Sequence, residues 1–265
     1  MRSRRIDEIE AYILDNKTVT LDQVCERFSI SKSTIRRDLD EILKKGTIKK
    51  IYGGVTAAPR KGLVSFEERN ISNHSAKERI AHRAAELVRD NDIIYIDSGT
   101  TTMHMIDVLG ACRNLTVLTN SLEVILRAVP YENINVISLS GTLNRKTLSF
   151  TGPSAEQVLQ GYNVSKAFMA TTGFTIENGV TNSSPLEFGI KTEAVRRSRE
   201  VILLADGDKC GIVSLMTYCG LDQINTLVTD REPPEDVAKF LRNKDVEILF
   251  AVPESQDSSL EAVSH

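Results

Sequence analysis

The sequence predicts an α/β protein in which a small, mainly helical domain precedes a larger domain built on a doubly wound, largely parallel sheet. Residues 1–58 contain capped, amphipathic helical patterns followed by a strand pattern. From residue 75 onward, short apolar runs alternate with helical patterns, which is typical of α/β folds. The chain of 265 residues is also longer than most single domains, so two domains are expected.

The charge of the chain is divided between these two regions. The net charge of the whole chain is only −3. Residues 1–61 contain 14 Lys and Arg residues against 9 Asp and Glu residues, a net charge of +5, whereas the remainder contains 19 against 27, a net charge of −8. A basic segment suits a polyanionic partner. We therefore expect the first domain to contact nucleic acid and the second to have another task.

Cysteine usage and hydropathy exclude several classes of protein. Cys25, Cys112, Cys210 and Cys219 are widely scattered, with no CxxC spacing and no histidine pair that would complete a zinc site. The segment 1–5 runs directly into an amphipathic pattern, and no apolar run has the length of a membrane span. We expect a soluble, cytoplasmic protein with reduced thiols and with no metal, cofactor or membrane partner.

Three helices are predicted in the first domain. The first covers residues 2–15. The second begins at Thr20–Gln23, which has the form of a capping box, and the third begins after Ser31, a residue suited to the N-cap position. Their apolar residues recur at helical spacing and are expected to share a small core: Ile6, Ile9, Ile13, Leu14, Leu21, Val24, Phe28, Ile35, Leu39 and Ile42.

The second and third helices form a helix-turn-helix pattern, and basic and hydroxyl residues cluster at the start of the third. In a DNA-binding helix-turn-helix this helix lies in the major groove, with its N-terminal residues at the base edges. Arg36 and Arg37 are the best candidates for binding guanine or phosphate, because a guanidinium fits both acceptors. The residues expected to bind DNA here are Thr20, Ser31, Lys32, Ser33, Thr34, Arg36 and Arg37.

A wing is predicted after these helices. Gly46 supplies a helix stop, residues 47–55 alternate like a strand, and two glycines permit a tight turn. The wing residues expected to reach DNA are Lys49, Lys50, Tyr52, Gly53 and Gly54. A small helical bundle with a solvated basic face and a plain supporting hairpin are the alternatives.

The spacing of these residues resembles that of a known family. The Ser-x-x-Thr-Ile-Arg-Arg-Asp-Leu segment of residues 31–39, followed by Gly46 and then Tyr52-Gly53-Gly54, is similar to the DeoR family of bacterial transcription regulators. The resemblance implies an N-terminal winged helix-turn-helix joined to a sensor domain related to sugar-phosphate isomerases. Within that family, residues 52–56, 96–102 and 166–169 resemble the repressors of inositol catabolism.

The sequence places the domain boundaries as follows: a DNA-binding domain over residues 1–58, a linker over 59–74, a sensor domain over 75–252 and a disordered tail over 253–265. Ser75–Glu78 has the capping-box form and is expected to begin a helix. The strands of the sensor are predicted at residues 93–96, 115–118, 134–139, 167–170, 201–205, 227–228 and 248–252.

Polar residues follow several of these strands, where ligands bind in doubly wound sheets. Loops of hydroxyl groups and backbone amides at helix starts suit a phosphate. The resemblance implies that most of these segments line a pocket for a phosphorylated sugar effector. The candidate effector-binding residues are Asp97, Ser98, Gly99, Thr100, Thr101, Thr102, Thr119, Asn120, Ser121, Gly141, Arg145, Lys146, Thr151, Gly152, Glu187, Lys191, Asp206 and Lys209.

Simpler structural roles would also explain each loop taken alone. Hydroxyl residues often cap helices, and Glu187 in Ser184-Pro185-Leu186-Glu187 has the position of a capping residue. Arg145 and Lys146 could be a solvated charge pair. The convergence of the loops at the strand ends favours a binding site.

Two other functions compete with a sensor. The larger domain could be an active sugar-phosphate isomerase or deaminase, which would need a positioned general base. Ribose-phosphate isomerases carry acidic residues after the middle strand, but residues 170–174 here are Ala-Thr-Thr-Gly-Phe. We therefore expect no catalytic site and no enzyme activity. The domain could also serve only for oligomerisation.

The sequence as a whole is interpreted as a transcriptional regulator, a repressor of a sugar or polyol catabolic operon. Its expected partners are operator DNA and a phosphorylated intermediate of the pathway, which would release it from the operator. One helix-turn-helix buries little surface on DNA, so we expect a homodimer or homotetramer.

Overall fold

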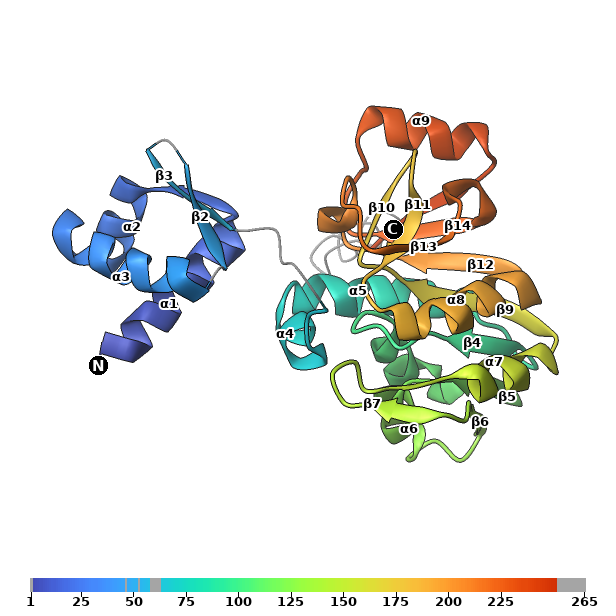
Figure 1. Ribbon diagram of the computed structural model, residues 1–265. Helices are drawn as coiled ribbons and strands as arrows, with labels where there is room; N and C mark the ends of the chain where they lie inside the picture. Colours follow the sequence, from blue (N-terminus) through green and yellow to red (C-terminus); the bar gives the residue numbers. More distant parts are fainter. Residues whose placement is uncertain (1, 46, 52, 58–62, 252–265) are drawn as a thin grey trace, which may run out of the picture. The chain divides into compact units, whose positions relative to one another are not determined.

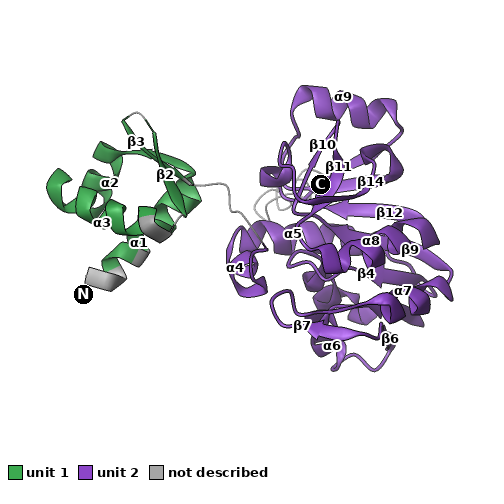
Figure 2. Cartoon of the chain, in the orientation of Figure 1, with its two compact units in different colours: residues 1–62 green, residues 63–265 purple. Residues whose placement is uncertain are grey.

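The structure is a computed structural model that describes residues 2–45, 47–51, 53–57 and 63–251 (Figure 1). The chain divides into two compact units, residues 1–62 and residues 63–265 (Figure 2). Gly46, Tyr52 and the predicted tail lie outside the described residues, as does the segment 58–62 of the predicted linker.

Unit 1 has three helices and a small antiparallel sheet in the described part of the chain. The helices are α1 (Arg2–Asn16), α2 (Leu21–Phe28) and α3 (Lys32–Lys45). The strands are β1 (Thr18–Thr20), β2 (Ile48–Ile51) and β3 (Gly54–Ala57), which pair in the order β1-β3-β2. The hairpin of β2 and β3 is the predicted wing.

The local signals in unit 1 form as the sequence predicts. The Thr20 hydroxyl accepts a hydrogen bond from the Gln23 amide at 3.2 Å, and the Gln23 side chain accepts one from the Thr20 amide at 2.8 Å, so the capping box is complete. Ile9, Ile13 and Ile35 are fully buried in one core. Each fully buried aliphatic side chain of this size contributes about 1.5–3 kcal/mol to stability.

Unit 2 is built on a seven-stranded parallel sheet with the order β15-β14-β12-β9-β4-β5-β6 (Figure 1). Its strands are β4 (Ile93–Ile96), β5 (Leu115–Thr119), β6 (Ile134–Ser138), β9 (Val164–Ala170), β12 (Ser198–Leu204), β14 (Thr226–Thr229) and β15 (Glu247–Phe250). All seven correspond to predicted strands, so the α/β fold class is confirmed.

Helices cover both faces of this sheet. The helices of one face are α5 (His74–Ala85), the 3₁₀ helix η1 (Thr102–Ala111) and α6 (Leu122–Ala128), and those of the other are α7 (Pro153–Gln160), α8 (Pro185–Arg197) and α9 (Glu235–Asn243). Alternate residues of β4 divide between the two cores, because Tyr95 packs in one and Ile94 and Ile96 in the other. The sheet is therefore doubly wound.

The strand order places a topological switch point between β4 and β9. From β4 the chain continues to β5 and β6 on one side, and it then returns through β9 to β12, β14 and β15 on the other. Connections leave the carboxyl ends of β4 and β9 in opposite directions, which opens room for a ligand between them. The sequence alone did not give this order.

Short strands outside the main sheet were not predicted. A hairpin joins β7 (Thr142–Asn144) to β8 (Ser149–Thr151), and a second small antiparallel sheet contains β10 (Gly173–Thr175), β11 (Gly179–Asn182) and β13 (Met216–Cys219). Single-turn 3₁₀ helices η2 (Gly207–Lys209) and η3 (Leu221–Gln223) flank β13. These strands lack the continuous apolar runs by which the buried strands of the main sheet were predicted, some of which are equally short.

Two predictions around the linker are wrong. Residues 63–74 belong to unit 2. There the helix α4 (Phe66–Ile71) buries Phe66 in the core that it shares with α5 and η1. The helix α5 begins at His74 after Asn73, so the Ser75–Glu78 pattern is not its N-terminal cap. No helix in the described ranges is long and apolar enough to cross a membrane.

Candidate functional site

The start of α3 carries the exposed basic residues of unit 1. Lys32, Ser33, Arg36 and Arg37 are exposed and Thr34 is half-buried. Lys32 forms an ion pair with Asp22 at 2.6 Å, and this contact raises the pKa of the Lys32 amine. Among the described residues, no ion pair involves Arg36 or Arg37. These two guanidinium groups are therefore available to bases or phosphates.

Two other residues at these helix starts have structural contacts. Ser31 accepts a hydrogen bond from the Thr34 amide at 3.4 Å, as an N-cap does. Arg5 of α1 contacts the buried Asp38 through Nε at 2.9 Å. That contact is explained by the cost of burying an unpaired carboxylate, and it ties α1 to α3.

The wing presents Lys49 and Lys50 on an exposed strand. Lys50 forms an ion pair with Asp40 at 3.0 Å. Gly53 has a positive φ of 80° in the turn, and a Cβ atom on Gly54 would lie 2.2 Å from the Val19 carbonyl oxygen. Both glycines are thus required by the hairpin and by its pairing with β1.

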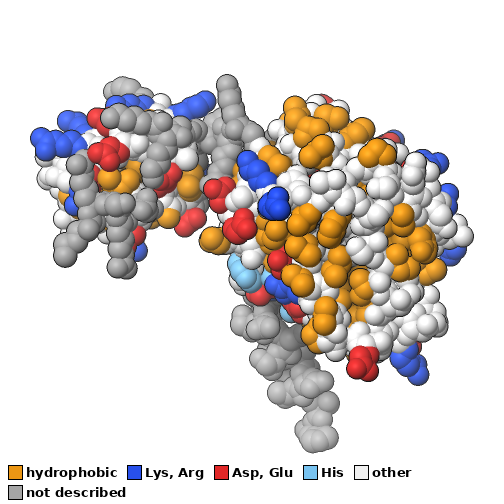
Figure 3. All heavy atoms as spheres, turned by 60° about the horizontal axis from the view of Figure 1, so that its bottom comes forward, with side chains coloured by type: hydrophobic (Ala, Val, Ile, Leu, Met, Phe, Trp, Pro, Cys, Tyr) orange, Lys and Arg blue, Asp and Glu red, His pale blue; other side chains and the backbone are white. Residues whose placement is uncertain are grey.

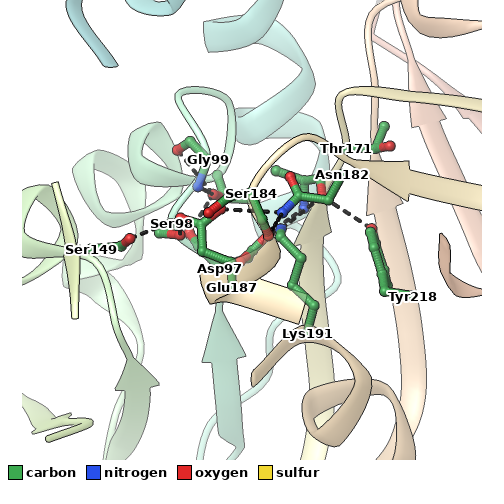
Figure 4. Close-up of polar contacts among 12 residues, drawn as sticks. Asp97, Ser98, Gly99, Ser149, Thr171, Asn182, Ser184, Glu187, Lys191 and Tyr218 are labelled. Atoms are coloured by element: carbon green, nitrogen blue, oxygen red, sulfur yellow. Dashed lines mark hydrogen bonds and ion pairs between the residues drawn. The ribbon is translucent and has the colours of Figure 1, made fainter. Parts of the chain in front are cut away.

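In unit 2, Asp97 connects the ends of the two strands at the switch point. It directly follows β4, and its Oδ2 accepts a hydrogen bond from the Ala170 amide at the end of β9, at 2.9 Å. Lys191 of α8 donates to the same Oδ2 and to the Ala170 carbonyl oxygen, the latter at 3.1 Å. The Tyr218 hydroxyl donates to that carbonyl at 3.0 Å. Figure 4 shows these side chains converging.

Glu187 is the second carboxylate of this cluster, and its interpretation as a capping residue is wrong. Ser184 occupies the N-cap position of α8 but makes no side-chain capping hydrogen bond. The Glu187 carboxylate instead accepts hydrogen bonds from Ser98 at 3.1 Å, Ser149 at 2.8 Å and Asn182 at 3.2 Å (Figure 4). The loop after β4 and the short strands β8 and β11, which are far apart in sequence, are joined through this one group.

The loop after β4 packs closely against β9. The Thr102 hydroxyl donates to the Asp97 carbonyl at 2.6 Å and accepts from the Gly99 amide at 3.2 Å. A Cβ atom on Gly99 would lie 2.1 Å from the Ala170 Cβ atom. Thr100 and Thr101 are buried as well. The helix that follows is the 3₁₀ helix η1 and not an α-helix.

The loop after β5 makes its hydrogen bonds within the protein. Thr119 donates to the Ile96 carbonyl at 2.7 Å, and Asn120 accepts from the Tyr95 hydroxyl at 2.9 Å. Ser121 caps α6 by accepting from the Val124 amide at 3.3 Å. The structure thus supplies a structural role for all three residues, and their contact with an effector stays a prediction.

Arg145, Thr151 and Gly152 line a surface hollow whose lining does not include Asp97, Ser98, Glu187 or Lys191. This hollow has a volume of about 620 Å³ and lies at the N-termini of α7 and α8. Its lining residues are Thr142, Leu143, Asn144, Arg145, Thr151, Gly152, Pro153, Glu156, Pro185 and Leu186. Arg145 and Lys146 are exposed, and Gly141 packs against the Thr151 backbone.

Asp206 and Lys209 follow β12. Asp206 is 2% exposed, its Oδ1 accepts from the Asp208 amide at 3.1 Å, and its Oδ2 is buried with no partner among the described residues. Asp97 Oδ1 and Ser184 Oγ share that condition. Buried polar atoms without a partner are rare and indicate an unsatisfied binding capacity.

Several residues near the site were not predicted. Ser149, Asn182 and Tyr218 come from short strands without a clear sequence signal. Arg69 on α4 and Lys77 on α5 add positive charge, and Lys77 is 3% exposed. Burial, Lys209 and Arg69 together lower the pKa of the Lys77 amine to about 8, against the effect of Asp206. Lys77 occupies an inward position of a helix whose other inward residues are apolar, and this position was the signal that could have marked it as a site residue.

The protonation of the nearby tyrosines decides which hydrogen-bond donors the cluster offers to a ligand. Burial raises the pKa values of the Tyr95 and Tyr218 hydroxyls well above their usual range, so both remain hydrogen-bond donors. Within the described ranges, no group of three or more His, Cys, Asp or Glu side chains could hold a metal ion. The arrangement offers hydroxyl, amide and cationic donors around two carboxylates.

Comparisons with known proteins place the chain in a family. A family model described as the DeoR C terminal sensor domain matches residues 72–231, and one described as the DeoR-like helix-turn-helix domain matches residues 5–61. The chain belongs to the DeoR family. It is thus a transcriptional regulator whose first unit is a DNA-binding domain and whose second is a sensor domain.

Relatives within the DeoR family align along nearly the whole chain. The HTH-type transcriptional regulator IolR of Bacillus subtilis is 41% identical over 95% of this chain and 100% of its own length. The L-fucose operon activator of Haemophilus influenzae is 30% identical over 84% of this chain and 90% of its own. The HTH-type transcriptional repressor GlcR of B. subtilis is 28% identical over 94% and 96%, respectively.

Solved structures align with part of this DeoR-family chain at low scores. A D-ribose-5-phosphate isomerase in complex with phospho-erythronic acid covers 52% of this chain and 54% of its own, with 17% identity and a TM-score of 0.39. A tetrameric eIF2B-beta2-delta2 complex from C. thermophilum covers 67% and 63%, with 12% identity and a TM-score of 0.46.

Proposed function

We propose that this DeoR-family regulator represses a sugar or polyol catabolic operon and that a phosphorylated intermediate of the pathway releases it from the operator. The observation that carries the proposal is the polar cluster at the switch point between β4 and β9. Asp97 and Ser98 from the end of β4 meet Glu187 and Lys191 of α8 there, and Asp97 also bonds the end of β9 through the Ala170 amide. Doubly wound sheets bind their ligands at this place.

The polarity of the cluster supports a phosphorylated polyhydroxy compound. Carboxylates and neutral donors suit sugar hydroxyls, whereas Lys77, Lys209 and Arg69 suit a phosphate. Asp97 Oδ1, Asp206 Oδ2 and Ser184 Oγ are buried without partners among the described residues, so each could accept or donate a bond to a ligand. The relative named the L-fucose operon activator is consistent with a sugar-related operon.

The switch follows from linkage. An effector that binds the DNA-free state of the protein more tightly must weaken operator binding by the same factor. An effector with equal affinity for both states would shift nothing. The direction of control is taken as repression, which GlcR has in its name, although the fucose relative is named an activator.

Binding to an operator is expected to involve two copies of the chain. One recognition helix contacts one half-site, and symmetric dimers read palindromic operators. Large hydrophobic side chains are exposed on unit 2, and Figure 3 shows hydrophobic side chains gathered on the face turned forward there. We therefore propose a homodimer or a homotetramer, which sedimentation of the full chain would distinguish from a monomer.

The alternative is an isomerase-like enzyme with an appended DNA-binding domain. Glu187, which is 5% exposed, accepts hydrogen bonds from two hydroxyl groups in the cluster and would be its base. Its oxygens already accept three hydrogen bonds, which occupy the atoms that would take a proton from a substrate. Turnover of a sugar phosphate by the purified chain would favour this alternative.

The test is operator binding by gel shift, with DNA from upstream of the chain's own gene and a panel of sugar phosphates and polyol-pathway intermediates. We expect specific binding that one phosphorylated compound abolishes. If the DNA is bound and no compound alters binding, the proposed effector class is wrong. If no upstream DNA is bound, the role as a repressor at that site fails.

A further inference from the structure

Arg69, on the helix α4, presents a guanidinium group beside the Asp97 cluster. Its Nε is buried and has no hydrogen-bond partner among the described residues, and the group lies over the Phe66 ring at 5.6 Å. Burial lowers the pKa of this guanidinium, against the opposing charges of Glu187 and Asp97. A guanidinium has five N–H donors in a planar fork that fits a phosphate or carboxylate.

Polar contacts fasten α4 to the segments that carry predicted effector residues. The Phe66 amide donates to the Lys146 carbonyl at 2.8 Å, which joins α4 to the β7–β8 loop. Lys77 donates to the Arg69 carbonyl, and Asn73 donates to Asp208 of η2 at 3.3 Å. The position of α4 is therefore linked to the loops at the strand ends.

Two of the cations at these strand ends have no carboxylate partner. Among the described residues, neither Arg69 nor Lys77 forms an ion pair, although Glu187 and Asp97 act on the Arg69 charge and Asp206 acts on that of Lys77. Asp97 and Lys191 neutralise one another in an ion pair. Excess positive charge at a partly buried site is costly, and an anion would relieve it.

The helix α4 has few apolar contacts of its own to hold it in place. It is six residues long, it buries Phe66, and Ile71 is 79% exposed. A helix this short is not stable without its tertiary contacts. A ligand that binds the Arg69 guanidinium would therefore stabilise α4 in its position.

The helix α4 is the first helix of unit 2 after the connection from unit 1. The strand β3 of unit 1 ends at Ala57 and α4 begins at Phe66, so residues 58–65 connect the two. A ligand bound to Arg69 acts on the first helix that follows the connection from the DNA-binding unit.

We propose that Arg69 couples effector binding to DNA binding: the anionic group of the effector binds the Arg69 guanidinium and fixes α4 against the strand ends. The chain leading to unit 1 then starts from a fixed helix, and the operator-binding state loses population. This inference rests on the proposed function, because it requires an anionic effector at the Asp97 cluster.

The test compares Arg69→Gln with the wild type in the full chain. Arg83→Gln is the matched control, because Arg83 lies on α5 and forms an ion pair with Glu86. We expect Arg69→Gln to bind the operator as the wild type does, to bind the releasing compound roughly 10-fold or more weakly, and to stay on the operator at saturating compound. Arg69→Lys keeps the charge without the fork and should respond partially if Arg69→Gln folds poorly.

Complete release of Arg69→Gln at saturating compound would show that Arg69 only adds affinity, and it would overturn the coupling. If no compound releases the wild type, the proposed function fails, and hydrogen exchange in the full chain decides the inference separately. With inorganic phosphate as the probe, amides of residues 63–71 should exchange more slowly in the wild type and not in Arg69→Gln. Equal exchange in both would overturn the inference.

Discussion

Asp97 and Lys191 form an ion pair that is almost fully buried, with side chains 1% and 4% exposed. Asp97 directly follows β4, and Lys191 lies on α8, 94 positions later in the chain. The pair joins the two halves of the sheet at their switch point, because Asp97 also accepts from the Ala170 amide of β9. It is therefore both a structural link and a part of the proposed effector site.

Asp97→Asn should destabilise unit 2 by about 3–5 kcal/mol, because it leaves the Lys191 charge buried without its partner. The free energy of unfolding in urea measures this loss. The double variant Asp97→Asn with Lys191→Met removes both charges and should recover much of it. If the double variant loses as much unfolding free energy as Asp97→Asn and Lys191→Met lose together, the ion pair does not stabilise unit 2.

Gly99→Ala should disturb the loop after β4, because the new Cβ would lie 2.1 Å from the Ala170 Cβ atom. Overpacking of this kind costs about 1–3 kcal/mol. Ala170→Gly removes the opposing methyl group, so Gly99→Ala with Ala170→Gly should regain stability relative to Gly99→Ala alone. A double-mutant cycle by thermal unfolding checks this, and additive losses would contradict the close contact.

The sequence predicted the parts of the fold whose signals are local. The capping box at Thr20, the apolar spacing around Ile35 and the seven strands of the main sheet all depend on neighbours within a few residues. Glu187 shows the limit of such signals, because its Ser98 partner lies 89 positions away. Its sequence context favoured a cap, and tertiary contacts decided otherwise.

Arg37→Ala should weaken specific operator binding by about 1–3 kcal/mol if Arg37 contacts a base edge. Arg113→Ala is the control, because Arg113 is an 88% exposed arginine of unit 2. Fluorescence anisotropy at fixed salt, with operator and unrelated DNA, measures both. An equal loss on both DNAs would assign Arg37 to phosphate contact instead.

Lys49→Ala should weaken binding to all DNA sequences alike, because an exposed wing lysine is expected to contact phosphate. The slope of log affinity against log salt should fall in magnitude by about 1. Affinity measured over a series of salt concentrations gives this slope. An unchanged slope would remove Lys49 from the DNA-contacting surface.

Lys77 should make the stability of unit 2 depend on pH above neutrality. Its pKa is lowered from 10.5 to about 8, so the unfolded chain binds this proton more tightly than the folded one. Between these values the free energy of unfolding should rise by about 1.4 kcal/mol per pH unit, and below about pH 8 this group contributes no dependence. Lys77→Met should lack that rise. Urea unfolding at about pH 7.5 and about pH 9.5 checks this, and an identical pH dependence in both proteins would contradict it.

Two cations of the site, Arg69 and Lys77, could not be predicted from local pattern. Arg69 lies in a segment with the composition of a linker, and α4 is too short to show a helical period. Lys77 occupies the inward face of α5, where a lysine gives no indication of its partners. Both residues are brought to the strand ends by the packing of α4 and α5, which only the tertiary structure reveals.

The central claim is that one ligand site in unit 2 controls operator binding by unit 1. Calorimetry with the phosphorylated compound found by gel shift should give its affinity for the free chain and for the chain saturated with operator DNA. The operator should weaken compound binding by the same factor by which the compound weakens operator binding. Equal compound affinity with and without operator would contradict the claim.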